Sequence, residues 1–509
     1  MVIGPVELEI ARHQFAAVAD EMGIVLRRTA FSPNIKERAD CSAAVFVPNG
    51  EMLAQAEHIP VHLGSMPASI SAIAMLDIIP GRQYAVNDPY RGGTHLNDLT
   101  LVKPVFVGSD HIGWVANRAH HADVGGEAPG SMPAHATRLD QEGHVVEPTV
   151  AVMDGGWVES FVEPFLAATR TPEERRGDLA AQMGANEVGA ARLYGLAAAL
   201  GIDAFKSTTS ALLDYGERRA AAAIAALPHG VFRFTDYMEW KGDLLPIMVS
   251  LSVDGDSVTA DFAGTHHQVD GNINAVEAVT RSCLYYAARV ATDPEMPANG
   301  GVYRRMRLVA PQGTLVNARP GAAVAAGNVE TSQRIADVLL GAFAGAAPDR
   351  VPAASQGTMN NVLIGNDRFA YYETLAGGQG GSPFGPGESG VHTGMTNTLN
   401  TPIESLEQHY PFGVERYRLR EGSGGLGRHT GGDGIERIIR FDEAATVSLM
   451  GERRILAPWG LAGGEAGLCG ADYVSRHGRS WEPLEGKVTL EVEAGDRLKV
   501  ETPGGGGWG

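Results

Sequence analysis

The sequence predicts a mixed α/β protein of the α+β kind, built from several packed subdomains. Apolar residues recur at helical spacing in some stretches and alternate with polar residues between turn residues in others. The strand-like stretches follow one another in groups, so the βαβ order of a doubly wound sheet is missing. No GxGxxG segment opens a predicted helix after a strand, and no GxxxxGK[ST] segment occurs. We therefore expect no Rossmann or P-loop domain.

The N-terminal part of the chain is predicted to begin with a helix, a hairpin and a second helix. Apolar residues at helical spacing cover residues 5–29. Two strand-like runs flank a Pro-Asn-Gly turn at residues 48–50, which is typical of a hairpin over residues 39–59. Residues 64–79 are again helical in pattern, and a longer hairpin follows them.

The predicted secondary structure differs between successive segments of the remaining chain. Residues 172–227 are rich in alanine and start with Thr-Pro-Glu-Glu, which predicts a pair of helices. Strands are expected in residues 230–265, and helices in 273–291 and 328–344. Beyond residue 357 the pattern is β-rich and glycine-rich, with loops such as GGQGGSPFGPGESG. We expect four regions: a hairpin region with a metal site (1–170), a helical region (171–229), a mixed α/β region (230–356) and a β-rich region (357–509).

Composition and charge restrict the class of protein. The 509 residues carry a formal net charge of −19, which argues against nucleic acid or an anionic membrane surface as a partner. No apolar run approaches the length of a membrane span. The three cysteines are far apart and form no CxxC pair, and the N-terminus is acidic where a signal peptide would be basic. We expect a cytoplasmic protein.

The most informative segment is the hairpin between residues 87 and 126. Its turn is centred near Ser109, so Asp98, eleven residues before, is predicted to lie opposite His120, eleven residues after. His95 precedes Asp98 by three residues. Imidazole and carboxylate groups gathered at one end of a hairpin suit Zn²⁺, Mn²⁺ or Fe²⁺. The spacing therefore predicts a divalent metal site with an open position.

Neighbouring residues extend this prediction. Adjacent residues of a strand face opposite sides, so His120 is favoured as the ligand, and His121 or Asp123 would support it or face a substrate. Asp40 of the first hairpin is a fourth candidate ligand. Glu37 and His58 are the alternatives to Asp40 that remain open.

Eleven segments together resemble the hydantoinase B/oxoprolinase family. They span nearly the whole chain in the family order, and their joint occurrence is highly specific. These segments are ERADCSAAVF, HIPVHLGSMP, NDPYRGGTHLNDLTLVKPVF, AHHADVGG, DFAGTHHQVDGNIN, GNVETSQRIADVLLGA, GTMNN, ETLAGGQGG, NTPIESLEQHYP, RLREGSGGLGRHTGGDGIER and TPGGGGWG.

The resemblance implies a subunit of a larger enzyme. Family members are B-type subunits of ATP-dependent cyclic amidases, such as N-methylhydantoinase, 5-oxoprolinase and caprolactamase, or of acetone and acetophenone carboxylases. A separate A-type subunit or fused domain, an actin-like ATPase, binds ATP and phosphorylates the substrate oxygen. Carried across by motif, the metal ligands of the family fall on Asp40, His95, Asp98 and His120.

The function expected from these observations is hydrolysis of a small cyclic amide in a hetero-oligomer with the A-type ATPase subunit. The metal would supply the attacking hydroxide, and His121 or Asp123 would act as general acid or base. A ketone carboxylase subunit is the rival, which the length of 509 residues disfavours because acetone carboxylase alpha subunits are longer. A scaffold for the ATPase subunit, without catalysis, is the third hypothesis.

Overall fold

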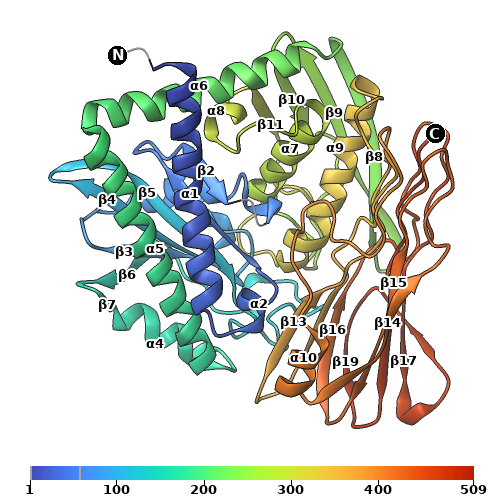
Figure 1. Cartoon of the computed structure of the whole chain (residues 1–509). Coiled ribbons are helices and arrows are strands. Elements are labelled where there is room, and N and C mark those ends of the chain that lie inside the picture. Colours follow the sequence, from blue (N-terminus) through green and yellow to red (C-terminus); the bar gives the residue numbers. More distant parts are fainter. Residues whose placement is uncertain (1–2, 57–58) are drawn as a thin grey trace.

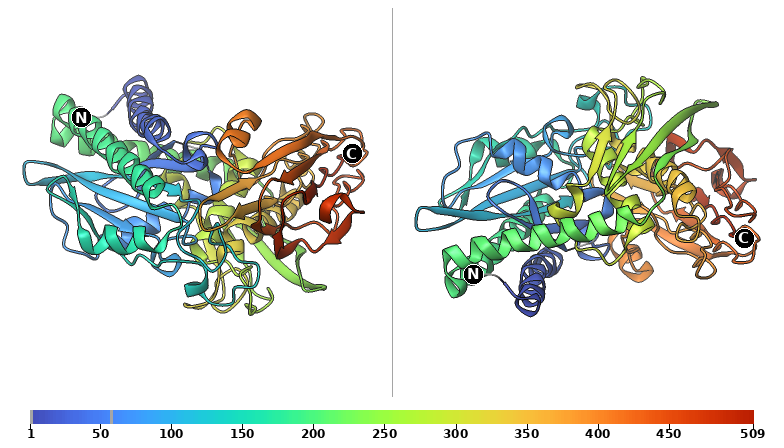
Figure 2. Two further views of the ribbon diagram at one scale, coloured as in Figure 1. Left: turned by 90° about the horizontal axis from the view of Figure 1, so that it is seen from below. Right: turned by 90° about the horizontal axis from the view of Figure 1, so that it is seen from above.

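The computed structural model describes residues 3–56 and 59–509. The chain is arranged as an N-terminal part, a central part and a C-terminal part that follow one another along the long dimension of the molecule (Figure 1 and Figure 2). Helices and strands both contribute substantially, and the C-terminal part is almost entirely β, as the sequence predicted.

The N-terminal part is built on a seven-stranded sheet. Its order is β2 (Met52–Ala56), β1 (Cys41–Phe46), β5 (Asp110–His120), β4 (Asp98–Val107), β3 (Gln83–Val86), β6 (Thr149–Met153) and β7 (Gly156–Trp157). The hairpin of β4 and β5 therefore lies near the centre of this sheet, where neighbouring strands cover both of its edges. A position inside a sheet gives rigid backbone support to side chains at the strand ends.

Helices cover one face of this sheet. Figure 1 shows α1 and α5 lying in front of it. Val115 of β5 packs toward α1, against a group that includes Phe15 and Met22, whereas Trp114 points into the central core on the other face. α1 (Pro5–Thr29) contacts β1 and β2, and α5 (Pro172–Leu200) contacts β4 and β5. α4 (Glu159–Ala168) packs against β6 and α5, and α6 (Ile202–Ala225) packs against α5 and α1.

The central part combines a four-stranded sheet with two buried helices. The sheet order is β11 (Met306–Val309), β10 (Ser257–Asp261), β9 (Asp243–Asp254) and β8 (Gly230–Trp240), and α7 (Glu277–Thr292) and α9 (Ser332–Ala346) pack beside it. Among the named strands of the described residues, β10 and β11 are the one parallel pair. Nothing in this arrangement resembles a doubly wound sheet, as expected.

Two antiparallel sheets enclose the core of the C-terminal part. They are β13 (Ala370–Thr374), β12 (Asn361–Gly365), β16 (Ala445–Met450) and β19 (Lys487–Val492), and β14 (Phe412–Arg420), β15 (Gly434–Phe441), β20 (Arg497–Glu501), β17 (Ala471–Ser475) and β18 (Glu482–Leu484). Their glycine-rich loops pack backbone against backbone. A Cβ atom on Gly432 would lie 1.9 Å from the carbonyl oxygen of Glu388, so only glycine fits there.

Two helices have ends that differ from those predicted by sequence periodicity. The helix expected at 64–79 is observed as α3 (Met66–Ile73), and the chain then runs in turns toward Pro80, which disfavours helix before it. The helix expected at 328–344 begins as a π-helix, η4 (Gly327–Thr331), ahead of α9. The other short helices are α2 (Pro33–Lys36), α8 (Gly300–Tyr303), α10 (Ile403–His409), η1 (Pro60–His62), η2 (Pro89–Arg91), η3 (Leu139–Gln141) and η5 (Arg476–Gly478).

One hydrophobic core joins the regions that the sequence separates. It contains buried residues from Ala44 in the first sheet to Met450 in the C-terminal part. The division into four regions stays a prediction. In the described part of the chain, no individual helix has the length and apolar composition of a membrane span, and only α5 and α6 taken together, across a bend of 110°, meet that criterion.

Candidate metal centre

The register of the β4–β5 hairpin places Asp98 directly opposite His120, which confirms the pairing predicted from the sequence. Asp98 is the first residue of β4 and His120 is the last residue of β5. β5 also pairs with β1, and the backbone N–H of His120 donates to the carbonyl oxygen of Asp40 at 3.1 Å. The start of β1, the start of β4 and the end of β5 therefore lie side by side at one end of the central strands.

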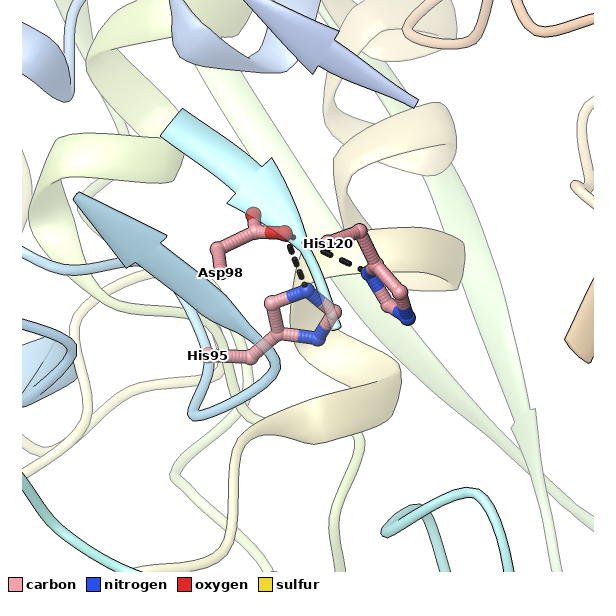
Figure 3. Close-up of side chains that lie close together, drawn as sticks. All are labelled: His95, Asp98 and His120. Carbon is pink, nitrogen blue, oxygen red and sulfur yellow. Dashed lines mark ion pairs between the residues drawn. The ribbon is translucent and has the colours of Figure 1, made fainter. Parts of the chain in front are cut away.

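His95, Asp98 and His120 form a compact buried cluster. Asp98 Oδ1 lies 3.0 Å from His95 Nε2 and 3.3 Å from His120 Nδ1, so the carboxylate lies between the two imidazoles (Figure 3). One ligand atom from each residue lies within 4.8 Å of the others, and each residue is at most 2% exposed. Among the described residues, Nδ1 of His95 and Nε2 of His120 have no hydrogen-bond partner.

These residues fit a divalent metal ion. Buried imidazole nitrogens without partners are costly unless a ligand satisfies them. Two imidazoles and one carboxylate form a ligand set used for Zn²⁺ and for other first-row divalent ions. The prediction of Zn²⁺, Mn²⁺ or Fe²⁺ is thus compatible with the cluster, whose donor atoms do not choose among these ions.

A third imidazole, which the sequence reasoning did not single out, holds the other oxygen of Asp98. His62 Nε2 lies 3.2 Å from Asp98 Oδ2, and its Nδ1 lies 2.8 Å from Ser42 Oγ. Thr94 Oγ1 donates to the same Asp98 oxygen at 2.7 Å. His62 comes from the short helix η1, so no strand pairing could indicate it, and its only signal was the HIPVHLGSMP segment itself.

The charges around Asp98 set its ionisation. Burial raises the pKa of Asp98, but His95, His120 and His62 outweigh burial and hold this pKa well below its ordinary value. Burial lowers the pKa of His120 and that of His62. Asp98 is therefore favoured as an ionised carboxylate, and His120 and His62 as neutral imidazoles, which are the forms that bind metal ions.

Asp40 lines the same small cavity as Asp98 and His120 but is outside the three-residue cluster. Its pKa is raised by burial, and its Oδ2 lies 3.9 Å from the Arg38 guanidinium. Its assignment as a fourth ligand stays a prediction. Of the alternatives, Glu37 is half-buried at the end of α2 and is not among the described residues lining the cavity, and His58 lies outside the described residues.

The remaining walls come from distant parts of the chain. The ring of Tyr372 stacks on His120 with centroids 4.4 Å apart, and Arg38 lies over the Tyr372 ring at 4.7 Å. Asn328 of the π-helix also lines the cavity. The cavity has a volume of about 20 Å³, which is room for an ion or a water molecule.

The two residues predicted as general acid or base point away from this cavity. His121 Nε2 lies 2.9 Å from Gln182 Oε1 on α5, and the His121 ring packs on Phe165. Asp123 accepts hydrogen bonds from Arg170 Nη1 at 2.8 Å and from the backbone N–H of Gly130 at 3.1 Å. Their catalytic roles stay predictions, and these contacts favour structural roles.

The burial of His121 predicts an acid-sensitive contribution to stability. Burial and the nearby Arg175 lower the pKa of His121 to about 4. Below pH 6.5 the unfolded chain binds a proton there that the folded chain excludes. Stability from this residue is therefore present above pH 6.5 and falls, by up to about 3 kcal/mol, as the pH decreases toward 4.

Urea unfolding between pH 7.5 and 4.5 measures this effect. The variant His121→Gln should lose stability less steeply with falling pH than the parent chain. His135→Gln changes an exposed histidine and should keep the parent slope. If the free energy of unfolding depends on pH equally in the parent and in His121→Gln, the buried His121 is not the source of the acid sensitivity.

Known proteins are similar to this chain over nearly its whole length. The family model Hydantoinase B/oxoprolinase matches residues 4–509. An uncharacterized protein of Methanocaldococcus jannaschii is 42% identical over 99% of this chain and 90% of its own length. 5-Oxoprolinase 1 of Arabidopsis thaliana is 38% identical over 99% of this chain, which spans only 42% of that relative.

A solved structure is similar over the full length. The ATP-dependent caprolactamase of Pseudomonas jessenii has a TM-score of 0.93 and 26% sequence identity, with 100% of this chain and 92% of that chain covered. The motifs, the family match and the shared architecture agree over the same residues. The chain therefore belongs to the hydantoinase B/oxoprolinase family.

Proposed function

We propose that this chain is the metal-binding subunit of a cytoplasmic, ATP-dependent hydrolase of small cyclic amides. The observation that carries the proposal is the buried cluster of His95, Asp98 and His120. It lies in a chain whose relatives include a 5-oxoprolinase and a caprolactamase. The rival reading as a scaffold without catalysis would leave these buried, unpartnered ring nitrogens without a purpose.

Each residue of the centre has a proposed task. His95, Asp98 and His120 would hold the metal, with Asp40 as the fourth ligand. A divalent metal bound there lowers the pKa of a water molecule and polarises a carbonyl group. His62 and Thr94 fix the orientation of Asp98 through its second oxygen.

The cavity walls keep bulk water out. Ile59, Val61, Val329 and Met359 give apolar surface to the cavity, and the Tyr372 ring closes the side next to His120. Excluding water strengthens every charge interaction inside the site. An amide carbonyl that reaches this cavity would therefore interact more strongly with the charged groups there than it would in bulk water.

ATP is assigned to a partner. We propose that an A-type ATPase subunit binds ATP and phosphorylates the amide oxygen, which weakens amide resonance before hydrolysis. The share of the Arabidopsis 5-oxoprolinase that this chain spans, 42%, supports a division of labour between two polypeptide segments. The assembled enzyme would be a hetero-oligomer.

The test uses the complex of this chain with its partner ATPase. We expect ring-opened acid and ADP to appear together when hydantoin, 5-oxoproline or a lactam is supplied with ATP, and neither acid nor coupled ADP without the chain described here. Ketones with isotopically labelled bicarbonate form the opposing arm. If label enters the ketone and no cyclic amide is opened, the complex is a ketone carboxylase and the proposed hydrolase activity is wrong.

A further inference from the structure

The π-helix η4 brings one side chain into the metal cavity that no ligand role explains. A single π-helical turn ahead of an α-helix shifts the residues that follow and is frequent at functional sites. Here it spans Gly327–Thr331 and presents Asn328 to the cavity shared with Asp98 and His120. We propose that Asn328 is the residue that recognises the ring N–H of a cyclic amide substrate.

The backbone around Asn328 is fixed. A Cβ atom on Gly327 would lie 1.8 Å from the carbonyl oxygen of Asn274, so the segment is held in contact at a position that only glycine tolerates. The backbone N–H of Gly327 donates to the carbonyl oxygen of Asn272 at 2.9 Å, and Ser332 Oγ donates to that of Asn328 at 2.6 Å. Asn328 is thus presented from a rigid support.

The side-chain amide of Asn328 has one end engaged and one end free. Its Nδ2 lies 3.5 Å from Asp98 Oδ2, and a carboxylate oxygen can only accept, so the amide nitrogen faces Asp98. Its Oδ1 is buried and has no hydrogen-bond partner among the described residues, and the residue is 4% exposed. A buried acceptor left in this state is costly, and a ligand that donates a hydrogen bond removes the cost.

A larger cavity lies next to this one. It has a volume of about 360 Å³, enough for a five- to seven-membered ring, and Thr396 lines both cavities. Its lining residues also include Gln333, Thr393 and Gly394, and Thr393 Oγ1 is buried without a partner among the described residues. A ring held there would approach Asp98 and Asn328 past Thr396.

The chemistry of the free acceptor selects among substrates. A lactam, a hydantoin and 5-oxoproline each carry an N–H beside the carbonyl group, whereas a ketone has only carbon there. A site built to pair a substrate N–H discriminates strongly against the analogue that lacks it, because its polar group is then left unpaired. This inference rests on the proposed function and deepens it, since Asn328 would read the amide itself.

A matched pair of ligands tests the inference on the full chain without ATP. 2-Pyrrolidinone and cyclopentanone have the same ring size and differ by N–H against CH₂. Ligand-observed NMR titration is expected to show that the lactam binds at least about 10-fold more tightly than the ketone. Equal affinities, or no lactam binding, would overturn the inference.

Variants of the chain test whether Asn328 is responsible for the tighter binding of the lactam. Asn328→Leu keeps the branched shape of the side chain, removes its polar groups and should bind the two ligands equally. Asn328→Ala should do the same if the leucine disturbs folding. Asn49→Leu changes an exposed asparagine in the β1–β2 turn, outside both cavities, and should retain the lactam preference. Metal content and the thermal unfolding midpoint check that each variant is folded and loaded.

The outcomes separate this inference from the proposed function. If Asn328→Leu retains the lactam preference, Asn328 is not the recognising residue, whatever the complex catalyses. If the parent complex opens no cyclic amide while its chain still prefers the lactam by way of Asn328, the proposed hydrolysis fails and the recognition stands. Loss of the preference in Asn49→Leu as well would also overturn the assignment to Asn328.

Discussion

Replacing His95 with alanine is expected to remove the bound metal ion and, with it, ring-opening turnover by the complex. His95 is completely buried, its Nε2 lies 3.0 Å from Asp98 Oδ1, and its Nδ1 lacks a hydrogen-bond partner among the described residues. Changes to residues that merely orient a ligand lower metal affinity or activity by 10- to 100-fold. Removal of a ligand itself should therefore lower both metal affinity and activity by more than about 100-fold. Elemental analysis of the purified chain and ATP-coupled ring opening measure the two losses.

A matched control separates ligand loss from a general effect of removing a histidine. His135 is exposed, and its imidazole lies 3.2 Å from a carboxylate oxygen of Glu127 at the surface. His135→Ala should keep the parent metal content and activity. The metal assignment fails if His95→Ala, shown to be folded by its circular dichroism spectrum, keeps its metal and turns over at the parent rate.

The part of the centre that could be predicted is the part built from a local stretch of chain. The β4–β5 turn fixes the register, and the register places Asp98 opposite His120. The alternation of a strand then separates His120 from His121, and the structure shows His121 against α5. Both inferences need only the position of one turn.

The part that could not be predicted depends on packing between distant segments. His62 lies in a 3₁₀ turn, which is too short for a periodic pattern, and Asn328 lies in a π-helix, which sequence periodicity does not distinguish from an α-helix. Tyr372 reaches His120 from a strand more than 250 residues later in the chain. Asp123 was predicted from its place beside an imidazole, but its contacts run to Arg170, which no spacing rule could indicate. Helical periodicity likewise predicted the segment that contains Asn328 without revealing its wider turn.

The same limit applies to the fold. Helices α1, α5 and α6 were predicted because their apolar residues recur over many turns. The assembly of sheets was predicted only as a β-rich pattern, because the pairing of β12 with β16 or of β15 with β20 joins strands far apart in sequence. Charged side chains at such long-range contacts have no local signature at all.

One of these contacts predicts a large effect on stability. Arg437 of β15 and Glu373 of β13 form an ion pair in which each side chain is 1% exposed. Arg437→Met would leave the Glu373 carboxylate buried without its main partner. Breaking a buried pair in this way typically costs about 3–5 kcal/mol, so the free energy of unfolding at pH 7 should fall by that amount. Urea unfolding followed by circular dichroism measures it.

Two further variants show whether the buried charge is the cause. Arg437→Met with Glu373→Gln removes both charges and should recover much of the lost stability. Arg416→Met breaks a pair with Glu436 on the same sheet, but Arg416 is half exposed, so the loss should stay below about 1 kcal/mol. Equal losses for Arg437→Met and Arg416→Met would contradict the argument.

The dependence on pH supplies a signature that lost packing cannot imitate. Burial raises the pKa of Glu373, but Arg437 and Arg38 outweigh burial and lower it below its ordinary value. In the parent chain this carboxylate therefore adds stability above the unfolded pKa near 4.5, and the contribution is lost as the pH falls through the lower folded value. Without Arg437 burial dominates and the pKa of Glu373 should rise, so acidification would neutralise the stranded charge. The stability deficit of Arg437→Met should consequently shrink between pH 7 and pH 5, whereas a deficit caused by lost packing would stay constant.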